Sequence, residues 1–224
     1  MAAAIIFTDI ARDGLNNWGR LPSWECVQIS ISPNLPQHAG RTIGALAAER
    51  GQNPIDTVAD YLIEDKGATR VLVTSISEDD IRAIMRSPLA LVGSDGNCVA
   101  TYGTVSQGMP HPRFYGTFPR VIAHYAGELG VIPLELAIHK MTGATARALK
   151  LRDRGLLREN YCADVTIFNP ANFKDRATYA DPHQYPTGVR TTVIVNGTIV
   201  VEDATHTGAL PGKVLRRDGA GRVG

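Results

Sequence analysis

The chain has 224 residues, 44% of them hydrophobic and 6% aromatic, with 23 Lys and Arg against 22 Asp and Glu. This apolar fraction can build a core, which excludes a chain disordered throughout, and the length allows one domain with a smaller second one. The net charge of +1 argues against electrostatic capture of nucleic acid or of an anionic membrane.

The N-terminal stretch and the cysteines indicate a cellular compartment. The first ten residues, MAAAIIFTDI, lack the basic region of a signal peptide, and no window approaches the roughly 20 apolar residues of a membrane span. Cys26, Cys98 and Cys162 form no C-x-x-C pair, which favours reduced thiols over a disulfide framework. We therefore predict a cytoplasmic protein.

Short β-branched runs alternate with amphipathic segments up to residue 95, a pattern typical of parallel βα units. In the segment 53–64, Asn53 is a good helix cap and Pro54 suits the first helical position. Its apolar spacing predicts a buried face made of Ile55, Val58, Ala59, Leu62 and Ile63. Strands are expected at 5–7, 26–31, 71–76 and 89–95, and helices at 42–50, at 53–64 and between Ser77 and Pro88.

Residues 96–116 are rich in Gly, Pro, Ser, Thr and Asn and predict a long loop of the kind that usually acts as a lid or binding loop. Helices are expected at 117–129 and 133–150, the second broken near Gly143. Strand-like runs return at 164–169 and 189–203, where Asn196-Gly197 predicts a hairpin. The chain is therefore expected to be α/β, with an antiparallel β unit at its C-terminal end.

Four stretches together resemble one family. They are SEDDIRAIMRSPLALVGSDG (77–96), HPRFYGTFPRVIAHY (111–125), LELAIHKMTGATARALKLRDRGLLRENYCADVTIFNP (134–170) and VNGTIVVEDATHTGALPGKVLR (195–216). They resemble the C-terminal part of the N-acyl-D-amino-acid deacylases, or D-aminoacylases, of the amidohydrolase superfamily. The resemblance begins near residue 24, and HPRFYGTFPR after SDG is its most specific part.

The resemblance implies a zinc-dependent hydrolase that cleaves the linear amide bond of an N-acyl-D-amino acid. Its implied fold is the C-terminal part of a TIM-like (β/α) barrel followed by strands of a small β-sandwich. We expect the last βα units of the barrel at 1–158, including the lid loop 96–116, and the sandwich portion at 159–224. Such barrels carry their chemistry at the C-terminal ends of the strands.

Asp95 lies at the end of the expected strand 89–95, and the family's catalytic aspartate maps onto it. The resemblance implies that Asp95 acts as general base toward water and then as general acid toward the departing amine. An Asp before Gly96 also caps turns frequently, so a purely structural role stays open.

His111, Arg113 and Tyr115 lie in the expected loop and are candidate substrate-loop residues. An Arg can bind a substrate carboxylate through two parallel hydrogen bonds, and a nearby His can hold the loop or the catalytic Asp. Alternatively, His111 and Arg113 bind backbone carbonyls and fix the loop.

The family's zinc ligands are missing from the sequence. The family binds zinc through an early His-x-His, a cysteine and two later histidines, but this sequence has no His-x-His and no His before His38. A zinc site needs three or four converging protein ligands, so we assign no metal ligand in this chain. A barrel of eight strands takes about 250 residues. We therefore expect the chain to be inactive alone and to need an N-terminal barrel portion or self-association.

Two alternatives remain open at this point. The chain could be a non-catalytic interaction or scaffold protein derived from the half-barrel. It could also be a sibling cyclic amidohydrolase, similar to a hydantoinase or dihydroorotase, because the sandwich motifs are shared among these enzymes. The expected partner is a small N-acyl amino acid, with no nucleic acid and no membrane.

Overall fold

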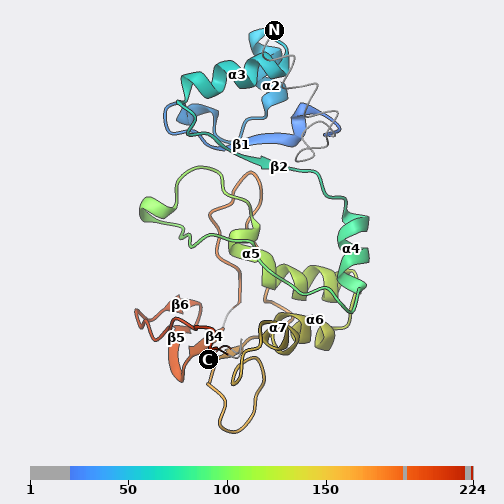
Figure 1. Ribbon diagram of the computed structural model, residues 1–224, viewed down its shortest axis with the longest axis vertical. Helices are drawn as coiled ribbons and strands as arrows, with labels where there is room; N and C mark the ends of the chain where they lie inside the picture. The colour runs from blue at the N-terminus through green and yellow to red at the C-terminus, as the bar shows by residue number, and fades with distance from the viewer. Residues whose placement is uncertain (1–20, 189–190, 220–222, 224) are drawn as a thin grey trace. The chain divides into compact units, whose positions relative to one another are not determined.

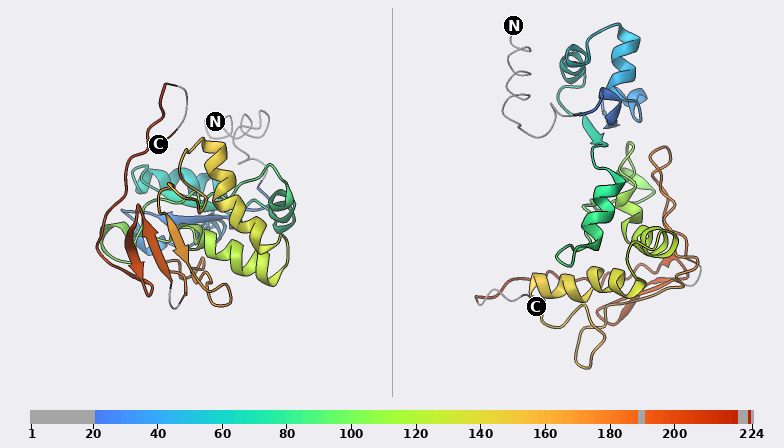
Figure 2. Two further views of the ribbon diagram at one scale, coloured as in Figure 1. Left: turned by 90° about the horizontal axis from the view of Figure 1, so that it is seen from below. Right: turned by 90° about the vertical axis from the view of Figure 1, so that its right-hand side faces the viewer.

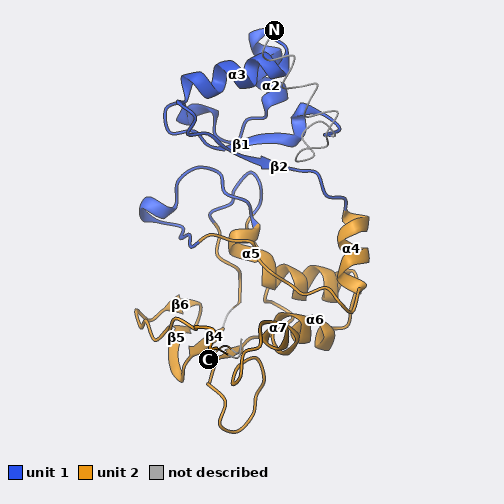
Figure 3. Cartoon of the chain, viewed as in Figure 1, with its two compact units in different colours: residues 1–77, 98–112, 178–183 blue, residues 78–97, 113–177, 184–224 orange. Residues whose placement is uncertain are grey.

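The computed structural model describes residues 21–188, 191–219 and 223. The chain folds into two compact units that interleave along the sequence (Figure 3). Unit 1 comprises residues 1–77, 98–112 and 178–183, and unit 2 comprises the rest. The expected strand 5–7 lies outside the described residues, and the domain boundary predicted at residues 158 and 159 stays a prediction.

Unit 1 contains two antiparallel strands, β1 (Val27–Ile31) and β2 (Arg70–Val73), in which Val27 faces Val73. The prediction of parallel βα units was wrong for this pair. A parallel pair is joined by a single crossover helix, but two α-helices lie between β1 and β2. The second helix reverses the direction of the chain once more, so β2 runs opposite to β1.

The two helices are α2 (Ile43–Arg50) and α3 (Pro54–Glu64), which lie on one side of the strands (Figure 1). The predicted cap of α3 is confirmed, because Asn53 Oδ1 accepts a hydrogen bond from the Ile55 amide at 2.9 Å. The core consists of Val27, Ile29, Ile43, Leu46 and Tyr61 from β1 and both helices, and the partly buried Val71 of β2 packs against it.

The predicted buried face of α3 was wrong for Ala59, Leu62 and Ile63, which are exposed, whereas Val58 packs against the core as expected. Leu62 and Ile63 are 44% and 76% exposed, whereas Thr57 and Tyr61 are fully buried. Tyr61 tolerates this position because its hydroxyl donates a hydrogen bond to Ser32 Oγ at 2.9 Å. A hydroxyl with a partner thus enters the core in place of an aliphatic side chain.

A buried carboxylate closes the C-terminal end of α3. Asp65 has no exposed surface, and its Oδ1 accepts the Asn34 amide at 2.8 Å while its Oδ2 accepts the Thr69 hydroxyl at 2.5 Å. The Asn34 side chain donates to the Asp65 carbonyl as well, at 3.0 Å. Asp65 therefore ties three segments of unit 1 together. Among the described residues of this unit, the 3₁₀ turns are η2 (Trp24–Cys26), η3 (Pro36–His38) and η4 (Gly103–Val105).

Unit 2 is mainly helical in its first part, and its core consists of Val121, Tyr125, Val131, Ile132 and Ala137. Pro119 lies inside α5 and cannot donate a backbone hydrogen bond, and the helix continues as a π-helix directly after it. The predicted break near Gly143 is confirmed, since Thr142 separates two helices. The helices are α4 (Glu78–Arg86), α5 (Arg113–Arg120), the π-helix η5 (Val121–Glu128), α6 (Leu134–Met141) and α7 (Gly143–Leu149).

The expected strand 89–95 is absent: these described residues adopt no regular secondary structure. Leu89 is 91% exposed, and Val92 packs against the helical core. A strand needs a hydrogen-bonded neighbour, and no strand of the described residues pairs with this segment.

The C-terminal part of unit 2 is a four-stranded antiparallel sheet in the order β3-β4-β5-β6, and its strands are coloured orange to red in Figure 2. The predicted hairpin is confirmed, because Asn196 and Gly197 have φ of 47° and 80° and connect two paired strands. The strands are β3 (Val165–Ile167), β4 (Thr192–Val195), β5 (Thr198–Glu202) and β6 (Thr205–His206).

Candidate functional site

Asp95 lies in unit 2 at a turn that Ser94 closes. The Gly96 amide donates to Ser94 Oγ at 3.3 Å, and the Asp95 backbone is left-handed with φ of 46°. The Asp95 side chain is 84% exposed. Ser94 therefore fills the turn-capping role, and the Asp95 carboxylate points elsewhere.

Arg113, the first residue of α5, binds Asp95 twice. Its Nη2 lies 2.5 Å from Asp95 Oδ2, and its Nε donates to the Asp95 carbonyl oxygen at 3.3 Å. Gly96 permits this approach, because a Cβ there would come within 3.3 Å of Phe114 Cα. One guanidinium thus fixes both the backbone and the side chain of the aspartate. An exposed pair of this kind contributes about 0.2–1 kcal/mol to stability, so its main effect is orientation.

Tyr115 is buried on α5 and does not lie in an open loop. Its ring meets the edge of Tyr185 at a centroid distance of 5.9 Å, and burial raises the pKa of the Tyr115 hydroxyl. The predicted loop 96–116 therefore ends earlier than expected. Because α5 begins at Arg113, both Arg113 and Tyr115 are held by a helix.

His111 belongs to unit 1, where Tyr179 contacts it. The Tyr179 hydroxyl lies 2.9 Å from His111 Nε2, and the two rings meet edge to face at 5.1 Å. Nearby, His183 Nε2 donates to the Gly108 carbonyl at 2.9 Å. The segment 178–183 thus anchors the loop within unit 1. The structure brings Asp95 and Arg113 together, and it describes His111 in a different unit.

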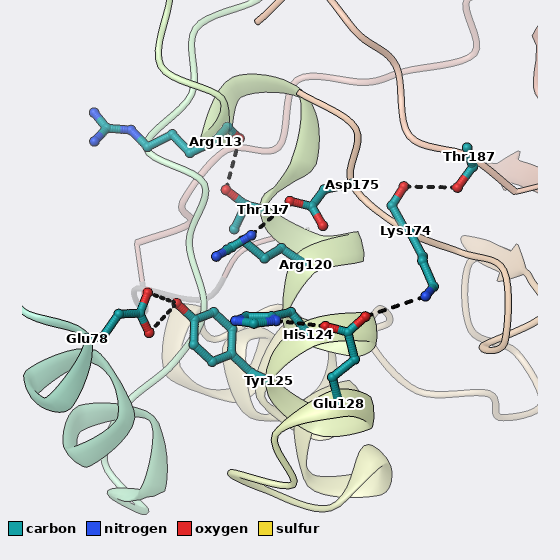
Figure 4. A network of polar contacts seen from close by, with 10 residues as sticks. All are labelled: Glu78, Arg113, Thr117, Arg120, His124, Tyr125, Glu128, Lys174, Asp175 and Thr187. Atoms are coloured by element: carbon teal, nitrogen blue, oxygen red, sulfur yellow. Dashed lines mark hydrogen bonds and ion pairs between the residues drawn. The ribbon is translucent and has the colours of Figure 1, made fainter. Parts of the chain in front are cut away.

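Unit 2 contains a second polar network, which was not predicted from the sequence (Figure 4). Tyr125 on the π-helix donates to Glu78 Oε1 at 3.1 Å, and burial raises the pKa of the Tyr125 hydroxyl. His124 Nδ1 lies 2.9 Å from Glu128 Oε2. Their spacing of four residues on a helix was a signal for that pair, whereas nothing in the sequence linked Glu78 to Tyr125.

Asp175 and Lys174 extend this network toward the sheet. Arg120 Nη1 contacts Asp175 Oδ2 at 3.2 Å, and Lys174 Nζ contacts Glu128 Oε1 at 3.4 Å. Hydrogen bonds from His124 and Lys174 lower the pKa of Glu128. A Cβ on Gly116 would lie 2.7 Å from Asp175 Cβ, so this glycine lets the segment pack against α5. The network holds the α5–η5 helix in place and with it Arg113.

The ADV and VNG motifs also have a structural explanation. Asp164 Oδ1 accepts the Asn196 amide at 2.8 Å, and Arg154 contacts both Asp164 and the Asn196 side chain. Burial opposes the ionisation of Asp164, but these hydrogen bonds outweigh it and lower its pKa. The motif therefore fastens the β4–β5 hairpin.

The described residues do not fit a zinc centre of their own. Across 21–188, 191–219 and 223, no three His, Cys, Asp or Glu side chains converge as metal ligands, whereas zinc takes three or four. The partner of Asp95 is an arginine, which repels a cation. In the same part of the chain, no helix is long and apolar enough to cross a bilayer.

Comparison with known proteins identifies relatives for most of the chain. D-aminoacylase of Alcaligenes xylosoxydans xylosoxydans is 38% identical over 185 residues, which are 83% of this chain and 36% of the relative. N-acyl-D-glutamate deacylase of the same organism is 34% identical over 192 residues, which are 86% of this chain and 36% of that protein. The chain spans about a third of the length of these curated relatives.

Solved structures agree with the sequence comparison. A crystal structure of D-aminoacylase matches with a TM-score of 0.71 and 36% identity, covering 82% of this chain and 36% of that one. N-acyl-D-glutamate deacylase from Bordetella bronchiseptica, solved with zinc and a phosphonate inhibitor, matches at 0.69 and 30% identity, covering 81% of this chain and 35% of that one. A further D-aminoacylase structure concerns that enzyme's binuclear metal centre.

The model of the amidohydrolase family matches residues 19–201, which is most of the sequence. The motifs that suggested deacylases lie within or next to this range, and the relatives carry that activity in their names. This chain therefore belongs to the amidohydrolase family, a family of metal-dependent amide hydrolases, and within it resembles the D-aminoacylases and N-acyl-D-amino-acid deacylases.

Proposed function

We propose that this chain is the C-terminal portion of an enzyme that hydrolyses the amide bond of N-acyl-D-amino acids, and that Asp95 is its general acid and base. The observation that carries the proposal is the contact between Arg113 and Asp95. It holds an exposed carboxylate in a fixed orientation, within a sequence that matches deacylases over 83% of its length.

Asp95 would accept a proton from the attacking water and deliver it to the departing amine, which then leaves as a neutral group. The carboxylate is exposed and is not used by the turn. Arg113 is proposed as a positioning residue, and substrate binding by Arg113, His111 or Tyr115 remains a prediction.

The proposed enzyme uses zinc held by residues other than those described here. Within the described ranges no cluster of ligands fits the ion, while relatives of about three times the matched length are metalloenzymes. We propose that residues 1–158 supply the last βα units of a barrel and residues 159–224 a sandwich portion. The scaffold and cyclic-amidohydrolase alternatives are not favoured by relatives named for deacylation. The cytoplasmic location stays a prediction.

Complementation tests this function. The chain is mixed with a polypeptide covering the part of D-aminoacylase that it does not match, and zinc and N-acetyl-D-amino acids are added. Hydrolysis is expected only in the mixture, and Asp95→Asn should reduce it about 10²–10⁴-fold.

Asp153→Asn provides a matched control, because it removes a carboxylate elsewhere in unit 2, where Asp153 accepts a hydrogen bond from Cys162. Activity of the mixture that is equal for Asp95→Asn and the unmodified chain would refute the assigned acid and base. A mixture that forms a complex but hydrolyses nothing would refute the deacylase assignment itself.

A further inference from the structure

A basic pocket lies between α7 and the segment that follows it. Five of its lining residues are cations, and the described part of the lining contains no Asp or Glu. The pocket is open to solvent and has a volume of about 610 Å³. Its cationic residues are Arg147, Lys150, Arg152, Arg154 and Arg158, with His139 and Tyr161 beside them.

This concentration of charge is out of proportion to the rest of the chain. The twelve residues 147–158 carry five basic side chains and one acidic one, whereas the whole chain has a net charge of +1. The sequence does not show it as a charge run, because apolar residues or Asp153 separate the cations. The fold brings the cations to one concave surface. There the positive charges repel one another and together attract negatively charged counter-ions.

Two of the five cations are neutralised within the protein. Arg152 forms an ion pair with Asp218, and Arg154 contacts Asp164 as part of the hairpin network. These two arginines therefore have a structural role and contribute little net charge to the pocket.

The other three cations are not matched by a carboxylate among the described residues. Arg147 donates to His139 Nε2 at 3.1 Å, which adds no negative charge. Arg158 lies over the Tyr161 ring at 5.9 Å, a contact that orients the guanidinium and leaves its N–H groups available. Lys150 lies at the C-terminal end of α7 in a left-handed conformation.

We propose that this pocket binds a small anion that carries at least two oxyanion groups, held by Arg147, Lys150 and Arg158. Guanidinium groups match phosphate and carboxylate oxygens through paired N–H donors, and the volume accommodates a ligand larger than a single phosphate. The site is separate from Asp95 and does not depend on the proposed amide hydrolysis.

Calorimetric titration of the full chain tests the site. Pyrophosphate and citrate serve as probes, with chloride at matched ionic strength of about 0.15 M as the reference. Saturable binding is expected with one site per chain. The two probes separate a phosphate-selective pocket from one that accepts any multiply charged oxyanion, and either result supports the proposal. The absence of saturable binding by both probes at millimolar concentration would overturn it.

A double variant locates the site. Arg147→Gln with Arg158→Gln should weaken binding by about tenfold for each guanidinium removed. The matched control, Arg86→Gln with Lys213→Gln, removes the same charge from residues that are exposed and do not line the pocket. Equal weakening in both double variants would mean a nonspecific charge effect and would refute the pocket.

A measurement on the unmodified chain avoids any folding defect in the variant. Acetylation of Lys150 by an activated ester is followed by mass spectrometry, with Lys213 as the internal reference. Pyrophosphate should slow the acetylation of Lys150 several-fold and leave Lys213 unchanged. Equal rates at Lys150 with and without the anion would exclude its participation in binding.

Discussion

Two aspartates in different units of this chain show how differently a carboxylate can be held. Asp65 in unit 1 is fully buried and accepts hydrogen bonds from Asn34 and Thr69, whereas Asp95 in unit 2 is mostly exposed and is held by the single side chain of Arg113. A buried carboxylate needs every oxygen satisfied and then serves as a rigid link between segments. An exposed carboxylate with one partner contributes little to stability but remains available for proton transfer.

The largest expected effect on stability is at Asp65. Asp65→Ala leaves the Asn34 amide and the Thr69 hydroxyl without their acceptor in a buried place, so the free energy of unfolding should fall by about 3 kcal/mol. Urea unfolding followed by circular dichroism measures it. The control Asp56→Ala, in the exposed first turn of α3, should cost less than about 1 kcal/mol. Equal losses would contradict the structural role of Asp65.

The contribution of the buried Asp65 to stability should also depend on pH. Burial opposes the ionisation of Asp65, but hydrogen bonds from Thr69 and Asn34 outweigh it and hold its pKa below the ordinary value of 3.8. A carboxyl whose pKa is lower in the folded state than in the unfolded state stabilises the fold at pH values above the unfolded-state pKa. This stabilisation is lost as the pH falls through the folded-state pKa.

The pH test therefore compares the unmodified chain with Asp65→Asn, which does not titrate. Below about pH 4 the unmodified chain should lose unfolding free energy more steeply than the variant. Parallel acid curves for the two proteins would show that Asp65 makes no such contribution.

The contribution of Asp164 to the free energy of unfolding should lie between those of Asp65 and Asp95. Its side chain is about a third exposed, and it accepts hydrogen bonds from Asn196 and Arg154. Asp164→Ala is expected to lower the free energy of unfolding by about 1 kcal/mol, measured by the same denaturant titration. A loss as large as that of Asp65→Ala would contradict the expectation that a more buried carboxylate contributes more to the free energy of unfolding.

The smallest change in stability is expected at Asp95. Asp95→Asn should lower the free energy of unfolding by less than about 1 kcal/mol, because an exposed ion pair contributes little. Thermal unfolding compares it with the unmodified chain. A larger loss would assign Asp95 to the framework of unit 2 and weaken its proposed catalytic role.

Local signals in the sequence predicted much of the secondary structure. The cap at Asn53 placed the start of α3, and the Asn196-Gly197 pair placed the hairpin, because both depend on residues adjacent in sequence. The antiparallel pairing of β1 with β2 and the burial of Tyr61 depend on distant partners such as Ser32. The segment 89–95 has the composition of a strand but no paired neighbour in the described structure.

Contacts between residues distant in sequence also determine the candidate site, and these could not be predicted. Asp95 was a candidate because of its motif, but its contact with Arg113 is made across 18 residues and depends on the close approach of Gly96 to α5. Lys140 is a further example, since it is buried and donates to the Ser87 and Ala90 carbonyls. No spacing rule in a single sequence links residues so far apart.

We propose that this chain supplies the acid and base of a deacylase but not its metal ligands. The most direct test is the hydrolysis of a panel of N-acetyl-D-amino acids by the purified chain alone with zinc added, followed by release of free amine. No release of amine above the rate without protein is expected. Steady turnover that requires zinc and is lost in Asp95→Asn would contradict it, because the chain would then contain a complete metal site.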